Sequence, residues 1–144
     1  MEIHFEIKTL IKNRDYLEVF NHFDKKLFNH LSKGQPIKLI RFDGSKLHDE
    51  IHLKFHLKKK WTSIITEEKI TDSEAYFIDE GTTLPFGLKK WKHKHIIRKR
   101  GTNCEIIDSI YFTGKNKTIS LLLLTPLFLP ILLRKVQYKS YFQN

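Results

Sequence analysis

Residues 76–97 read YFIDEGTTLPFGLKKWKHKHII, and this stretch predicts two strands joined by a loop that contains glycine and proline. In the second strand, Trp91, His93 and His95 alternate with lysines, and side chains two residues apart on a strand share one face. The lysine face must contact water, so we expect the tryptophan and the imidazoles to face inward. Because packed cores favour aliphatic residues and phenylalanine, this inward face is more typical of a cavity wall.

Composition limits the organisation of the chain. With 144 residues, of which 40% are hydrophobic and 29% charged, we expect a single domain over residues 1–144. Cys104 is the only cysteine, which excludes an internal disulfide and fits a reducing compartment. The start, MEIHFEIK, alternates and lacks the apolar segment of a signal peptide. These features predict a cytoplasmic protein.

The charge balance is strongly basic, with a net charge of +10 and a pI near 9.7. Basic residues cluster at 58–60 and 89–100, which would suit nucleic acid, an anionic membrane or simply a solvated sheet face. On the outer face of the sheet, aromatic residues do not interleave with these lysines, and no zinc-finger, helix-turn-helix or RNP signature is present. We therefore expect no nucleic-acid partner, whereas transient contact with an anionic membrane stays open.

Periodicity predicts an α+β protein. Residues 2–9 alternate as a strand, Asn13 or Asp15 can cap a first short helix, and Asp24 can cap a second. Six further strands follow one another with short connections, which makes neighbouring strands antiparallel. Their expected ranges are 37–42, 51–57, 61–71, 73–80, 88–100 and 104–112. A curved antiparallel sheet of about seven strands around a long terminal helix would bury all of these apolar faces.

The terminal segment has a different composition. Residues 118–142 are mostly helix-forming, and residues 119–133 are strongly apolar. This segment is too short, and too broken by Pro126 and Pro130, to be read as a transmembrane span, and we expect a kink or restart near the prolines. A helix buried against the sheet is the simplest interpretation. A cavity lid, a membrane-contacting face and a homodimer contact are the alternatives.

The chain resembles the START-like superfamily, also called SRPBCC, which includes the birch-pollen allergen, polyketide cyclases and lipid-transfer domains. It is most similar to small bacterial ligand-binding SRPBCC domains, and the likeness covers nearly the whole chain. The motifs that carry it are Phe77 and Asp79, Pro85 and Phe86, Trp91, His93 and His95, Ile106, Asp108 and Ile110, and the RFDG run at 41–44. The resemblance implies a helix-grip fold with a hydrophobic cavity between the sheet and the terminal helix. Carriers and enzymes share this scaffold, so the resemblance leaves the chemistry undecided.

The candidate cavity wall combines the inward faces of the sheet and the helix. Its apolar members are Phe55, Trp61, Phe77, Trp91, Ile97, Ile110, Phe128, Ile131 and Tyr138. Its polar candidates are Asp79, His93, His95 and Asp108, with Arg41 as a further candidate for binding a polar head group.

Four interpretations of these polar groups stay open. Buried ionisable groups are costly unless paired, so Asp–His pairs could brace the sheet. The imidazoles or Arg41 could instead orient a polar head while the cavity takes an apolar tail. His-x-His with a carboxylate has ligand types suited to zinc, and histidine titrates in the range needed for general acid–base catalysis. Because His-x-His alone is a weak metal signal and no nucleophile with an orienting base is recognisable, we assign no metal, no cofactor and no catalytic residue.

The sequence therefore predicts a protein that binds or carries a small hydrophobic or amphipathic molecule. The alternative is a cyclase- or dehydratase-like enzyme that acts on a polyketide-like or lipid-like substrate with the interior histidines and aspartates.

Overall fold

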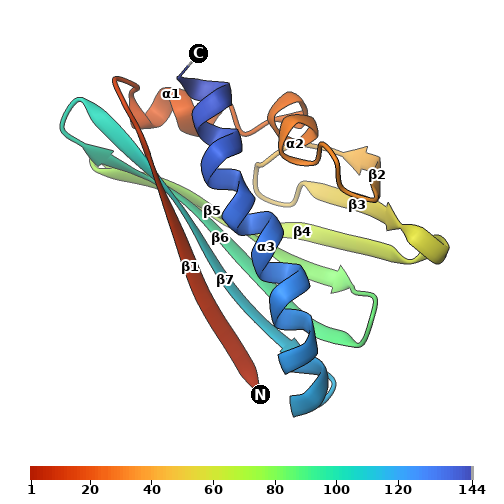
Figure 1. Cartoon of the computed structure of the whole chain (residues 1–144). Coiled ribbons are helices and arrows are strands. Elements are labelled where there is room, and N and C mark those ends of the chain that lie inside the picture. Colours follow the sequence, from red (N-terminus) through yellow and green to blue (C-terminus); the bar gives the residue numbers. More distant parts are fainter. Residues whose placement is uncertain (144) are drawn as a thin grey trace.

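The structure is a computed structural model that describes residues 1–143, so the last residue of the expected domain lies outside the described part. One strand is followed by two short helices, six strands and a long terminal helix, as the sequence predicted (Figure 1). In chain order these elements are β1 (Glu2–Ile11), α1 (Tyr16–Asn21), α2 (Lys25–Leu31), β2 (Ile37–Phe42), β3 (Glu50–Phe55), a 3₁₀ turn (His56–Lys58), β4 (Lys60–Ile70), β5 (Glu74–Thr83), β6 (Leu88–Arg100), β7 (Asn103–Gly114) and α3 (Lys117–Phe142).

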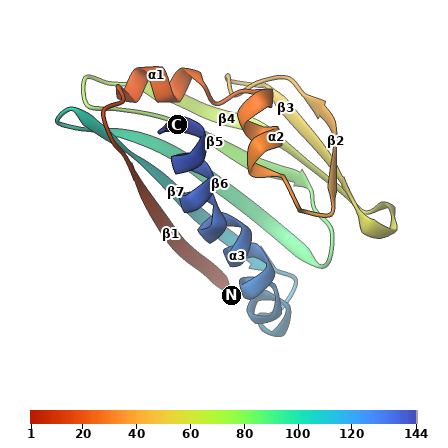
Figure 2. The ribbon, with the colours of Figure 1, turned by 45° about the horizontal axis from the view of Figure 1, so that its top comes forward.

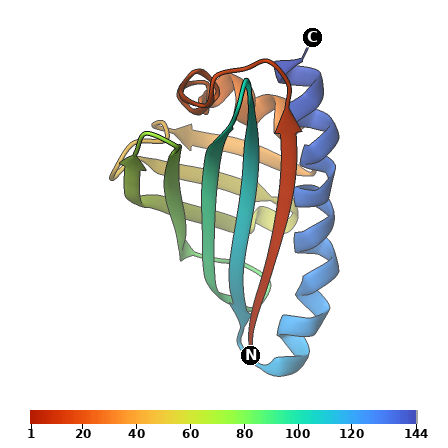
Figure 3. The ribbon, with the colours of Figure 1, turned by 90° about the vertical axis from the view of Figure 1, so that its left-hand side faces the viewer.

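The strands form one antiparallel sheet of seven strands in the order β1-β7-β6-β5-β4-β3-β2. The sheet is curved, and all three helices lie on the same side of it (Figure 2). The long helix α3 runs along β1 and β7, and α2 packs beside α3 (Figure 3). This arrangement confirms the predicted α+β helix-grip architecture, in which a curved sheet grips the terminal helix.

Short polar side chains set where the helices begin. The carboxylate of Asp15 accepts hydrogen bonds from two backbone amides at the start of α1, and that of Asp24 accepts one at the start of α2. Asn116 caps α3 in the same way. The hydroxyl of Ser120 then fixes the first turn of α3: it accepts from the Gly114 amide at 2.8 Å and donates to the Met1 carbonyl at 2.9 Å.

The core has two parts, which lie under different portions of the helices. One lies beneath α1, α2 and the end of α3, and includes Phe20, Phe23, Leu27, Phe77, Ile97, Ile106 and Tyr138. The other lies beneath the first half of α3, and its buried members are Ile7, Leu88, Trp91, Ile110, Phe112 and Ile131. The site described below lies where these two parts meet.

Two local expectations were wrong. The strand expected over residues 51–57 ends at Phe55, because Leu57 adopts a positive φ of 62° in the turn and is exposed. Of the kink or restart expected near the prolines, the restart is not seen, because α3 is continuous through Pro126 and Pro130. Missing amide donors at these positions leave the carbonyls of Leu122 and Pro126 without their usual helical partners.

Candidate functional site

Strand register brings four ionisable side chains together on the inward face of the sheet. Asp79 on β5 lies opposite His93 on β6, and His95 on β6 lies opposite Asp108 on β7. All four residues are buried, and for His93 and His95 this is what the alternation with lysines predicted. Lys90 and Lys92 are exposed on the other face of the same strand, which confirms the predicted orientation.

Each carboxylate pairs with the imidazole that is diagonal to it. Asp79 Oδ2 lies 2.8 Å from His95 Nε2, and Asp108 Oδ1 lies 2.7 Å from His93 Nε2. The two imidazoles stack, with ring centroids 3.6 Å apart. The Trp91 indole donates to the second oxygen of Asp79 at 3.3 Å, so the tryptophan that begins the motif orients the carboxylate.

The terminal helix completes this cluster from the opposite side. Arg134 Nη1 donates to Asp108 Oδ1 at 3.3 Å and to the Tyr138 hydroxyl at 3.4 Å. The Tyr138 hydroxyl also donates to Asp108 Oδ1 at 3.3 Å. Asp108 therefore links the sheet to α3. Buried polar atoms without a hydrogen-bond partner in the described structure include Asp108 Oδ2 and His95 Nδ1.

Burial and pairing set the charges of the cluster. Burial, together with the neighbouring His95, lowers the pKa of His93 to about 4, so this imidazole is neutral at pH 7. Burial alone would raise the pKa of Asp108, but the hydrogen bond from His93 and the charge of Arg134 outweigh it and hold the pKa at about 2. The pKa of Asp79 is lowered in the same way, because its bond to His95 overcomes the effect of burial. The cluster thus holds two carboxylates beside one guanidinium.

A cavity of about 120 Å³ opens beside this cluster. Asp79, His93, His95 and Arg134 line it from the cluster, and Asp24, Ser45 and Ser63 are its other polar lining residues. Its apolar wall comes from the segment around α2 and from strands β2 to β6: Phe23, Leu27, Phe28, Leu31, Phe42, Ile51, Leu53, Trp61, Phe77 and Trp91. The cavity therefore combines a mostly aromatic and aliphatic lining with the polar groups of the cluster and the carboxylate of Asp24.

A second cavity of about 140 Å³ lies between the sheet and the proline-containing part of α3. Both prolines of α3, together with Leu127 and Ile131, line it from the helix. The two cavities share six lining residues: Phe28, Leu31, Leu53, Trp61, Trp91 and Arg134. They are neighbouring compartments, with Arg134 and both tryptophans at the junction.

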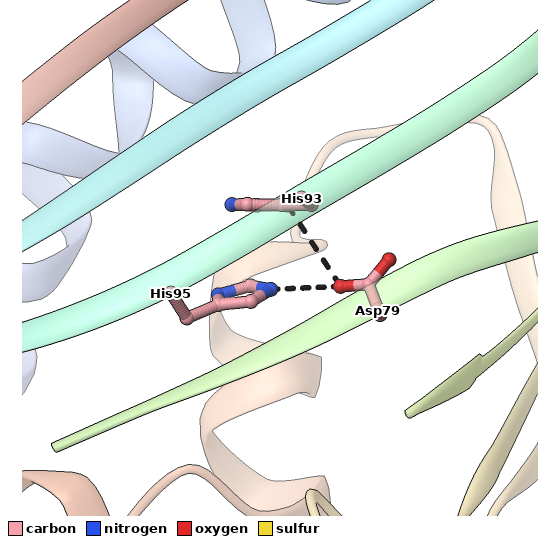
Figure 4. A group of neighbouring side chains, drawn as sticks. All are labelled: Asp79, His93 and His95. Carbon is pink, nitrogen blue, oxygen red and sulfur yellow. Dashed lines mark hydrogen bonds and ion pairs between the residues drawn. The ribbon is translucent and has the colours of Figure 1, made fainter. Parts of the chain in front are cut away.

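Three members of the cluster also offer atoms of the kinds that bind metal ions. Donor atoms of Asp79, His93 and His95 all lie within 4.8 Å of one another, and Figure 4 shows Asp79 beside the two imidazoles, with a dashed line to each. His93 Nδ1 is 4.0 Å from Asp79 Oδ2. A cation here would have to displace the existing His95–Asp79 bond, and the Arg134 charge opposes it. The observed bonds therefore favour a braced polar wall that presents hydrogen-bonding groups to the cavity.

The structure brings most of the predicted site residues together. Trp61, Phe77, Asp79, Trp91, His93 and His95 line the first cavity, whereas Phe55 and Ile131 line the second. Asp108 and Tyr138 stand behind the polar wall. Ile97 and Ile110 are fully buried in the core, and Phe128 packs edge-on against Phe5.

Arg41 is not brought to either cavity. Its guanidinium is half exposed and forms a two-pronged hydrogen bond with Asp43, with both distances 2.8 Å. The arginine of the interior is Arg134 instead, which the sequence analysis did not select. The signal was present, because Ile131, Arg134 and Tyr138 recur at helical spacing and so share one face of α3. The contribution of α2 was also missed, since Leu27, Phe28 and Leu31 look like ordinary core residues.

Comparison with known proteins shows where this fold occurs. No family model matches the sequence, and no curated protein matches it. Solved structures do match. Norcoclaurine synthase from Thalictrum flavum, in complex with dopamine and hydroxybenzaldehyde, is 11% identical with a TM-score of 0.64, covering 100% of this chain and 87% of that one.

Two further structures share the architecture. A major latex-like protein from Panax ginseng is 14% identical with a TM-score of 0.62, over 95% of this chain and 96% of its own. A hypothetical protein from Helicobacter pylori is 14% identical with a TM-score of 0.60, over 78% of this chain and 71% of its own. At these identities the likeness concerns the fold. The chain therefore shares the helix-grip fold of these solved structures, and this is the fold that the sequence resemblance implied.

Proposed function

We propose that the protein binds or carries a small amphipathic molecule whose apolar body occupies the two cavities and whose polar head meets Arg134. The observation that supports this proposal is the composition of the walls. Aromatic and aliphatic side chains line most of both cavities, and the few charged groups include Arg134, which lines both. This pattern is typical of small-molecule sites, in which a few polar groups fix the orientation of an apolar ligand.

Cavity size limits the ligand. An engineered apolar cavity of about 150 Å³ in another protein binds benzene. Each compartment here, of about 120 and 140 Å³, is therefore suited to one small ring or a short alkyl segment. The ligand class that fits is a compact molecule of one or two rings, or a short-chain amphiphile, and a long unfolded lipid chain is too large.

Arg134 is the group best placed to bind the head. Among the described residues, its side-chain hydrogen bonds use Nη1 alone, so Nε and Nη2 remain free to donate. Burial alone would lower its pKa, but the hydrogen bond to Tyr138 and the negative charges of Asp108 and Asp79 outweigh burial and raise the pKa, so the guanidinium stays charged. A planar guanidinium with two free donors favours a carboxylate, a phosphate or a carbonyl.

Mass spectrometry of a small-molecule extract tests this proposal. The purified protein is denatured, and the extract is compared with that of Leu53→Phe, which adds bulk at a position that lines both cavities. Leu47→Phe serves as the matched control, because Leu47 is exposed and lines neither cavity. We expect one molecule per chain from the wild type and the control, and a reduced yield from Leu53→Phe. Equal yields from all three proteins would argue against the cavities as the binding site.

We also propose, as the second candidate, an enzyme that acts on the bound molecule. One observation favours it: neutral His93 faces the cavity while its Nε2 is held by the Asp108 carboxylate. Such a carboxylate–imidazole pair is the arrangement of a general base, as a cyclase or dehydratase would need.

The variant His93→Gln separates the two candidates. Glutamine can still donate to Asp108 but cannot exchange a proton near neutral pH. An enzyme would lose turnover by roughly 100-fold or more while still binding its substrate. Turnover that is unchanged in His93→Gln would contradict the enzymatic candidate.

A further inference from the structure

The outward side of α3 is apolar and exposed over several turns. Eight exposed residues define what we call the outer face: Leu121, Leu122, Thr125, Pro126, Leu129, Leu132, Leu133 and Val136. Six of them are large hydrophobic residues with between 39% and 67% of their surface accessible. The outer face is about 22 Å long, because each helical residue advances about 1.5 Å. Exposed apolar surface of this continuity marks an interaction site in soluble proteins.

The charged side chains of α3 and of the segment before it have one sign. The chain has no aspartate or glutamate from residue 109 to its end. Lys115 and Lys117 are exposed at the first end of the outer face, and Lys139 is exposed beyond the other. Hence an apolar strip is flanked by cations at both ends, on a chain whose net charge is +10.

An apolar strip with lysines at both ends favours an anionic bilayer over a second copy of the chain as the partner. A second copy of the chain would place the same lysines against each other at the ends of paired helices, with no acidic residue to offset them. An anionic lipid bilayer offers what both parts of the surface need. Its headgroups attract the lysines, and its interface accepts leucine side chains from a helix that lies flat on it.

The helix must lie on the bilayer and cannot cross it while the fold is intact. By length and composition α3 could span a membrane, and only 11% of its most apolar 18-residue segment is buried. Its inner side is nevertheless bound to the sheet, with Ser120, Ile131 and Tyr138 buried and Arg134 paired to Asp108. Only the outer face is therefore available to lipid.

We propose that the outer face of α3 docks the protein on anionic phospholipid bilayers. The inference deepens the proposed carrier function, because Pro126 belongs to the outer face and also lines the second cavity. A ligand could thus pass between bilayer and cavity beside the prolines, where the helical hydrogen bonds are already interrupted.

Vesicle flotation tests this docking. The wild type is mixed with vesicles of phosphatidylcholine alone, or of an equal mixture of phosphatidylcholine and phosphatidylglycerol. We expect binding to the anionic vesicles only, and weaker binding as salt is raised. In the variant Leu122→Gln/Leu129→Gln/Val136→Gln the affinity should fall by more than about tenfold, because three apolar side chains no longer enter the interface.

Matched variants identify the surface that binds. Ile40→Gln/Leu47→Gln/Ile70→Gln changes three exposed hydrophobic residues away from α3 and should bind as the wild type does. In Leu129→Trp, the added tryptophan should shift its emission to shorter wavelength on anionic vesicles. Binding that is equal in both triple variants would overturn the proposal. So would a stable dimer in solution that the outer-face substitutions convert to a monomer, because the second copy would then be the partner.

The experiments distinguish failure of the ligand-binding proposal from failure of the membrane-docking proposal. The cavity variant Leu53→Phe should float with anionic vesicles as the wild type does, whereas the outer-face variant should still release the bound molecule on denaturation. Loss of flotation in Leu53→Phe would show that docking depends on cavity contents and would contradict an independent outer-face site.

Discussion

Asp108 is the residue on which the interior charges depend. It is completely buried, accepts from His93, Arg134 and Tyr138, and lies on β7, between β1 and β6. Removing it leaves the guanidinium of Arg134 buried without its nearest counter-charge. We predict that Asp108→Ala lowers the free energy of unfolding by about 3–5 kcal/mol, measured by urea denaturation.

Glu18→Ala is the control for this substitution. Glu18 on α1 also pairs with an arginine, Arg14, which precedes the helix, but both side chains are substantially exposed. Its removal should change the free energy of unfolding by less than about 1 kcal/mol. Similar losses in the two variants would contradict the role given to Asp108.

His93 gives stability a dependence on pH. An unfolded histidine takes up a proton near pH 6.5, whereas folded His93, with a pKa of about 4, does not. Between these values the unfolded state binds more protons, so stability falls as the pH is lowered from 6.5 to 4, by roughly 3 kcal/mol. Asp108, with a folded pKa of about 2 against an ordinary value of 3.8, extends the loss from about pH 4 downward.

Urea denaturation at a series of pH values checks this prediction. Glutamine does not titrate, so His93→Gln should show a shallower loss of stability between pH 6.5 and 4 than the wild type. Below pH 4 the two proteins should lose stability in parallel, because Asp108 takes up a proton more readily in the unfolded state than in the folded state. A pH profile unchanged by the substitution would show that His93 does not control the transition.

Individual residues differ in how far the sequence predicts their role. Alternation with lysines was sufficient to place Trp91, His93 and His95 inside, because a strand has only two faces. Arg41 and Arg134 show the limit. Both are arginines near apolar residues, and only the tertiary arrangement decides that one pairs with Asp43 on the surface while the other enters the interior.

At the scale of elements, the junction between β7 and α3 is the tightest point. A Cβ atom at Gly114 would lie 2.7 Å from the backbone nitrogen of Ser120 and 2.9 Å from Ile119 Cγ2. The first turn of α3 would have to move. We predict that Gly114→Ala lowers the free energy of unfolding by about 1–3 kcal/mol, measured by thermal or urea denaturation.

Gly81→Ala provides the comparison. There the added Cβ meets only the side chain of Leu84, which can change its rotamer. A smaller loss than in Gly114→Ala is therefore expected. If Gly81→Ala proved the more damaging of the two, the close approach of α3 to β7 would not be the sensitive contact.

Elements were predictable to within a few residues because each carries a local signal. Asp15 and Asp24 cap the two short helices as expected, and the sheet alternates where one face is buried. The continuity of α3 through Pro126 and Pro130 was not predictable, since the packing of Leu124, Leu127 and Ile131 against the sheet supports the helix on either side. Local sequence does not contain that support.

At the scale of the whole molecule, the sheet and α3 present opposite properties on their two sides. Inside, they enclose neighbouring, mostly apolar cavities that share the guanidinium of Arg134. Outside, α3 exposes an apolar face flanked by lysines. The fold class followed from the order of elements, whereas the division of the interior into two cavities depends on the position of α2, which periodicity does not specify.

Tryptophan fluorescence tests the central claim most directly, because the chain has two tryptophans and both line both cavities. Their rings lie 5.0 Å apart at the junction, next to Arg134. The measurement is a titration with 2-naphthoate, which has a two-ring body and a carboxylate head. We predict saturable quenching with one molecule per chain in the wild type and Leu47→Phe, and an affinity at least about tenfold lower in Leu53→Phe. Quenching that does not saturate as 2-naphthoate is added, or that follows the same curve in Leu53→Phe as in the wild type, would contradict a ligand-binding interior.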